Sequence, residues 1–83
     1  MNDDLQILEF LNDAKLRGVR FLISKYGDGM NIVAFRVIGD MEKAKKIVYD
    51  TFWRLWSERS FHNVSPPLRV FLYEEVKKAC AKY

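Results

Sequence analysis

The sequence predicts an all-α fold, a small bundle of three to four helices. Apolar residues recur every three or four positions in several segments, which is the spacing of one helix face and not the alternation of a strand. The two prolines and four glycines lie at a few points between these segments. A chain of 83 residues has material for one hydrophobic core, so we expect residues 1–83 to form a single helical domain.

The first helix is expected to begin at Asp3 or Asp4, because either carboxylate can cap a helix N-terminus. It is expected to end near Gly18. Its apolar face is formed by Ile7, Leu8, Leu11 and Ala14.

The next helical segment contains two glycines on either side of Asp28. Each glycine costs about 1 kcal/mol in a helix interior, so we expect a kink or a short break over residues 27–29. The apolar faces before and after this point are formed by Val19, Leu22, Ile23 and Tyr26, and by Met30, Val33, Ala34, Val37 and Ile38.

Gly39 and Asp40 predict a tight corner, because a C-terminal glycine is followed at once by an N-cap residue. The helix that follows, about Met41 to Ser57, has two apolar faces. We expect the first face to contact the core; it is formed by Met41, Ala44, Ile47, Val48, Phe52 and Leu55. The second face is an aromatic stripe of Tyr49, Trp53 and Trp56, which either a neighbouring helix or a partner protein could cover.

Residues 58–65 lack periodicity and predict a loop, after which Ser65 as N-cap and Pro66 at the first helical position start the last helix. Glu74 is spaced to pair with Lys78, and Glu75 is expected to pair with Lys78 or Lys82 or to extend into solvent. The core face of this helix is formed by Leu68, Phe71, Leu72, Val76, Ala79 and Tyr83.

The net charge of +3 is unevenly distributed, and the second half of the chain is the basic half. Residues 1–40 contain five Lys and Arg against six Asp and Glu, whereas residues 41–83 contain nine against five. This distribution fits either a polyanion partner or a well-solvated surface.

The residues offer little for catalysis or cofactor binding. One Cys and one His form no nucleophile–base pair or metal-ligand spacing, so we expect no enzyme activity, metal, cofactor or small-molecule substrate. His62 is expected to be a solvated side chain, and Cys80 either a small core residue or a thiol whose pKa nearby lysines lower. The acidic N-terminus and the absence of a long apolar run favour the cytoplasm over secretion or membrane insertion.

Three motifs in sequence resemble one protein family. They are IGD at residues 38–40, IV-x-x-x-F-x-x-LW at 47–56 and FLY-x-x-V at 71–76. Their order and spacing are similar to those of region 2 of RNA polymerase sigma factors of the extracytoplasmic-function (ECF) group, in a Bacteroidetes-like form. The resemblance covers about residues 19–83.

The resemblance implies a bacterial transcription initiation module with two binding surfaces. One surface would bind the clamp helices of the largest subunit of core RNA polymerase, and it would be formed by Lys45, Lys46, Tyr49, Asp50, Trp53 and Trp56. The other would capture the non-template strand of the melted −10 promoter element through phosphate contacts and base stacking, and it would be formed by His62, Asn63, Arg69, Lys77, Lys78 and Lys82. An anti-sigma factor is a possible further partner.

The sequence also departs from the family pattern at the surface expected to bind polymerase. Lys45 and Lys46 stand where the family commonly has acidic residues, and a charge reversal can abolish or redirect binding. The alternative function is therefore a degenerate sigma-like interaction module that forms a homodimer or binds an anti-sigma factor without promoter recognition.

Overall fold

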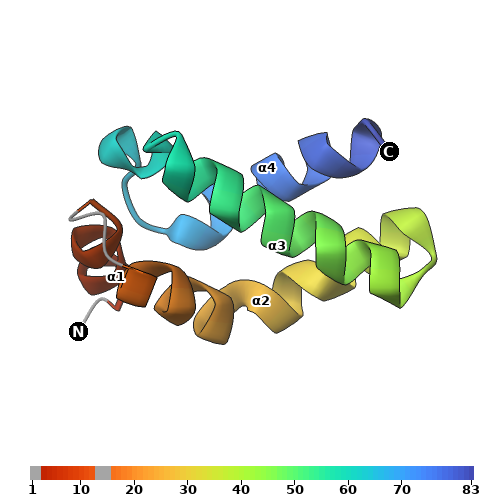
Figure 1. Cartoon of the computed structure of the whole chain (residues 1–83), viewed down its shortest axis with the longest axis horizontal. Coiled ribbons are helices and arrows are strands. Elements are labelled where there is room, and N and C mark those ends of the chain that lie inside the picture. The colour runs from red at the N-terminus through yellow and green to blue at the C-terminus, as the bar shows by residue number, and fades with distance from the viewer. Residues whose placement is uncertain (1–2, 13–15) are drawn as a thin grey trace.

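The computed structural model describes residues 3–12 and 16–83, and within this part of the chain it contains only helices (Figure 1). The predicted all-α fold is therefore confirmed. Ala14, which was expected on the first apolar face, lies outside the described residues. The elements are α1 (Asp3–Asn12), α2 (Leu16–Ile38), α3 (Met41–Ser57), the short 3-10 helix η1 (Ser60–Asn63) and α4 (Leu68–Ala81).

Helix α2 is continuous from Leu16 to Ile38, so of the kink or short break expected at residues 27–29 the break is wrong. Residues on both sides of the glycines, such as Leu22 and Ala34, are buried on one face. Burying this face in the core outweighs the propensity cost of two glycines. Gly18 does not end the first helix either, because it lies in the first turns of α2.

Gly18 lies where the end of α1 passes very close to α2. A Cβ atom built on this glycine would lie 2.7 Å from the backbone nitrogen of Leu11, a distance that real side chains do not adopt. The glycine therefore permits the two helices to pack backbone against backbone.

The corner between α2 and α3 is as expected. Gly39 has a φ of +78°, which favours glycine, and the Asp40 side chain accepts a hydrogen bond of 3.1 Å from the Lys43 N–H. Figure 1 shows this corner at the end of the molecule opposite α1.

The connection between α3 and α4 is more ordered than the predicted loop, because it contains η1. Phe61 of η1 is only 1% exposed, and its ring packs edge-on against Phe71 at 5.7 Å between centroids. This aromatic contact attaches the connection to the core.

Helix α4 begins at Leu68 and not at Pro66, so the predicted start is wrong by two residues. Pro66 precedes Pro67, and a residue before proline is disfavoured in the α conformation. The cap is also not Ser65: the N–H of Leu68 donates a hydrogen bond of 3.0 Å to the Asp4 carboxylate, from the other end of the chain.

Asp4 is buried and joins three helices, whereas the sequence indicated only a local cap for α1. Besides Leu68 of α4, the Lys25 ammonium of α2 donates to its carboxylate at 3.1 Å, and so does the Tyr26 hydroxyl. Burial alone would raise the pKa of Asp4, but the hydrogen bonds from Tyr26, Leu68 and Lys25 outweigh burial and hold that pKa below its usual value. The pKa of Tyr26 is raised by burial and by the bond to Asp4.

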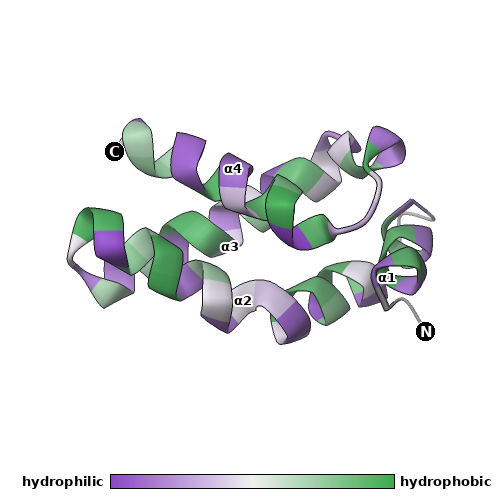
Figure 2. Ribbon diagram, turned by 180° about the vertical axis from the view of Figure 1, so that it is seen from behind, coloured by the Kyte–Doolittle hydropathy of each residue, from purple (hydrophilic) through white to green (hydrophobic). Residues whose placement is uncertain are grey.

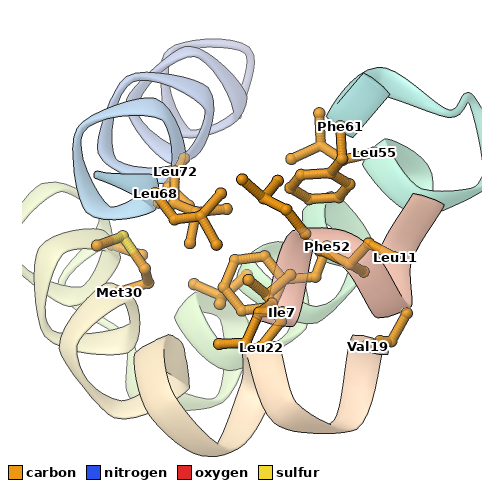
Figure 3. Close-up of a cluster of buried hydrophobic side chains, with 14 of the residues drawn as sticks. Ile7, Leu11, Val19, Leu22, Met30, Phe52, Leu55, Phe61, Leu68 and Leu72 are labelled. Atoms are coloured by element: carbon orange, nitrogen blue, oxygen red, sulfur yellow. The ribbon is translucent and has the colours of Figure 1, made fainter. Parts of the chain in front are cut away.

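One cluster of buried apolar side chains lies between the helices, with Phe52 of α3 near its centre (Figure 3). Phe52, Leu22 of α2 and Leu72 of α4 are fully buried. Hydrophobic and hydrophilic residues alternate along the helices, as expected when each helix buries one face (Figure 2). Three residues expected on the apolar faces are exposed because they lie at the ends of their segments: Val37, Met41 and Tyr83.

Candidate functional site

The aromatic stripe of α3 is only partly covered by the rest of the protein. Tyr49 and Trp53 are 40% and 42% exposed, whereas Trp56 is half-buried and packs against the core. The rings of Trp53 and Trp56 meet edge to face at 5.7 Å between centroids, so the half-buried Trp56 packs against the more exposed Trp53. We call Tyr49 and Trp53 the α3 aromatic pair.

The charged residues predicted around this pair lie on two sides of α3. Lys45 and Lys46 are exposed one turn before Tyr49, and helix geometry places them beside the α3 aromatic pair. Asp50 is also exposed, but it lines a hollow between α3 and α4. The expected polymerase-binding set is therefore grouped on one face except for Asp50 on the α4 side and the half-buried Trp56.

A second surface is an open groove of about 730 Å³ between α2 and α4, which we call the α2–α4 groove. Its apolar floor is formed by Met30 and Val33 of α2 with Val70 and Tyr73 of α4. Val70 is 53% and Tyr73 42% exposed, so these two side chains are accessible to a ligand.

Three of the residues predicted to bind DNA lie at the rim of the α2–α4 groove. They are Arg69, Lys77 and Lys78. Lys78 also lines the hollow between α3 and α4, where Lys82 lies. Among the residues that the structure describes, no acidic group is within ion-pair distance of Arg69, Lys77 or Lys82. Three of the four cations at residues 69–82 therefore have no ion-pair partner within the described part of the chain.

The ion pairs of α4 differ in detail from those expected. Lys78 pairs with Glu75 at 3.3 Å, and not with Glu74. Glu75 is largely buried and also lies 3.6 Å from Arg54 of α3, so it links the two helices. Of the alternatives for Glu75, pairing with Lys78 is confirmed.

His62 and Asn63 are exposed in η1, away from the α2–α4 groove. His62 lines a small hollow of about 160 Å³ together with Trp56 of α3 and Asn12 of α1. The structure therefore places the two η1 residues beside the end of α3, and it does not bring them into one groove with Arg69 and Lys77.

The environment of Cys80 is not that of a reactive thiol. Cys80 is buried, and burial raises the pKa of its thiol, so the expectation of a small core residue is confirmed over that of a reactive thiolate. No three His, Cys, Asp or Glu side chains in residues 3–12 and 16–83 lie close enough to hold a metal ion. None of the described helices has the length and apolar character needed to cross a bilayer.

Sequence reasoning missed the floor of the α2–α4 groove. Val70 and Tyr73 lie off the core stripe of α4, and two apolar residues off that stripe were the available signal. The helix that forms the other side of the groove is set by how α4 packs in the fold. The sequence of α4 alone does not show that packing.

No family model, curated protein or solved structure matches this chain. A connection to sigma factors therefore rests on the three sequence motifs alone.

Proposed function

We propose that this protein is a transcription initiation module of the bacterial cytoplasm, which binds core RNA polymerase through α3 and captures the melted −10 promoter strand through α4. The sequence motifs supply the identity of both partners. The observation that carries the proposal is that Arg69 and Lys77, which have no ion-pair partner among the described residues, are exposed on either side of Tyr73 along one row of α4.

This row suits a single-stranded nucleic acid for a physical reason. Arg69, Tyr73 and Lys77 are spaced by four residues, so they follow one another along one face of α4. Cationic groups at such intervals contact successive phosphates and release counterions, and an aromatic side chain between them gives a base a surface on which to stack.

The α3 aromatic pair supports the second half of the proposal. Exposed aromatic side chains are typical anchors of protein interfaces, and Trp53 is held in place by Trp56 before any partner binds. Lys45 and Lys46 beside the pair favour an acidic patch on the partner.

The polymerase half is tested by titrating the chain with a fragment carrying the polymerase clamp helices and following Trp fluorescence. We expect saturable binding that Tyr49→Ala and Trp53→Ala each weaken by about tenfold or more, as for hot-spot residues. Arg69→Ala is the matched control and should bind as the unchanged protein does. Absence of binding at tens of micromolar would remove polymerase from the proposal.

The DNA half is tested by fluorescence anisotropy with a labelled single-stranded −10 oligonucleotide at several salt concentrations. We expect Arg69→Ala and Lys77→Ala to weaken binding and each to reduce the salt slope by about 0.7. Lys45→Ala is the control, since it lies on α3. Equal slopes for all three variants would place the strand elsewhere.

The alternative, a sigma-like interaction module, would give a different pattern in the same samples. Self-association through the α3 aromatic pair would appear in sedimentation as a concentration-dependent dimer that Tyr49→Glu disrupts. Together with absent polymerase binding, that outcome would replace the initiation function by the interaction module.

A further inference from the structure

The α2–α4 groove has a floor that a nucleic acid strand at its rim would leave unfilled. Met30, Val33 and Val70 are aliphatic and offer no surface on which a base stacks. The one aromatic residue that lines the groove, Tyr73, has the Lys77 ammonium over its ring at 5.3 Å from the centroid and offers a stacking surface to one base only. Phosphate contacts at the rim therefore leave an exposed apolar surface below, and such a surface calls for apolar side chains.

The groove has the length of a short helix-binding site. The residues that α4 contributes extend from Arg69 to Lys78, which corresponds to roughly 13 Å along the helix axis. On the α2 side Val37, which is 57% exposed, follows Val33 by one turn and continues the apolar surface. An amphipathic helix of a few turns could place its apolar face along this line.

The charge at the rim specifies the flanks of such a helix. Arg69, Lys77 and Lys78 line the groove with one acidic residue, Glu74, and Lys78 also pairs with Glu75. Arg69 and Lys77 have no acidic partner among the described residues. A helix with acidic residues beside its apolar face would complement both the floor and the rim.

We infer that the α2–α4 groove is a docking site for an acidic amphipathic helix of a partner protein. The site is separate from the α3 aromatic pair and does not depend on the proposed initiation function. Under the proposed initiation function Arg69 and Lys77 would contact both ligands, so a helix bound in the groove would compete with a single strand on α4. This competition, unlike the docking itself, rests on the proposed function.

The test uses the full chain and a fluorescein-labelled synthetic peptide of about 18 residues, long enough to form a helix. The peptide carries Leu at helical spacing on one face and Glu on both flanks. Two control peptides have Lys in place of Glu, or Ser in place of Leu. We expect saturable binding of the Glu peptide by anisotropy and binding weaker by at least about tenfold for both controls.

Two protein variants locate the site. Val70→Asp places a charge on the groove floor and should weaken binding of the Glu peptide by at least about tenfold. Ile32→Asp changes an apolar residue of α2 that is 50% exposed and does not line the groove, so it should bind as the unchanged protein does. Circular dichroism is used to check that both variants keep the helical fold.

A charge exchange tests the role of the rim. The double variant Arg69→Glu, Lys77→Glu should no longer bind the Glu peptide and should bind the Lys peptide instead. Any of three results would overturn the proposal. The Glu peptide does not reach saturation, its binding is weakened equally by Val70→Asp and Ile32→Asp, or the charge exchange does not change which peptide binds.

Adding the −10 oligonucleotide to the peptide complex separates this inference from the proposed function. Displacement of the peptide by DNA supports the shared rim. DNA binding without peptide binding would overturn the docking site and leave the initiation function standing. Peptide binding without DNA binding would support the docking site and overturn promoter capture by α4.

Discussion

The two halves of α2 differ in how closely the rest of the protein approaches them. In the first half the backbone of α1 lies against Gly18, and Lys25 and Tyr26 hold the buried Asp4 carboxylate. In the second half the α2–α4 groove opens beside Gly29, where an added Cβ would meet nothing within 4 Å. The difference teaches that one helix can be a closely packed support at one end and one wall of a binding site at the other.

The largest effect is expected from removing the carboxylate that ties the packed half together. Asp4→Ala leaves the Leu68 N–H and the Tyr26 hydroxyl without their acceptor, and each lost partner costs about 1–3 kcal/mol. We expect a loss of about 3 kcal/mol in the free energy of unfolding, measured by urea denaturation. Asp28→Ala, an exposed carboxylate on α2, is the control, and equal effects of the two changes would contradict the assigned role.

The ionisation of Asp4 should make stability depend on pH in a defined direction. The pKa of Asp4 is lowered in the folded protein, so its contribution is complete above the ordinary value of 3.8 and is lost as the pH falls through the folded pKa. We expect the unchanged protein to lose more stability than Asp4→Asn between neutral pH and this acid range. Parallel pH profiles of the two proteins would show that the carboxylate gains nothing from its partners.

The next effect tests the close approach of α1 to α2. Gly18→Ala places a methyl group against the backbone of Leu11, and backbone atoms cannot move aside as a side chain can. We expect a loss of about 2 kcal/mol in the free energy of unfolding, as for an overpacked contact. Thermal unfolding measures it, and an unchanged midpoint would mean that the two helices are free to separate.

The smallest effect has the opposite sign. Gly29→Ala adds the same methyl group in open space on the same helix, where alanine has a higher helix propensity. We expect a gain of up to about 1 kcal/mol. Because the substitution is identical to that at position 18, a loss of stability at Gly29 would contradict the contrast between the two halves of α2.

The parts of the fold that depend on neighbouring residues could be predicted from the sequence. Gly39 and Asp40 set the corner and the first residue of α3, and both signals act within a few residues of the chain. The two stripes of α3 also follow from helix geometry, whereas the exposure of Tyr49 and Trp53 does not, because a neighbouring helix could have covered them.

The parts that depend on distant residues were predicted wrongly or were missed. The continuity of α2 through Gly27 and Gly29 depends on burial of its face by other helices. The cap of α4 is a hydrogen bond to Asp4, 64 residues away in the chain, although the start after Pro67 is a local effect of the two prolines. The candidate site divides in the same way, because the charges of α4 were visible in the sequence, whereas the opposing wall of the α2–α4 groove comes from another helix.

The hydrogen bond between Asp4 and Leu68 has a consequence for the order in which the protein is assembled. During synthesis the carboxylate leaves the ribosome long before the amide that it binds, so α4 lacks its N-terminal acceptor until most of the chain has emerged. A contact across 64 residues also carries a large loop-closure cost. We therefore expect α2 and α3 to pack together first during folding, and α4 to dock onto them as the final step.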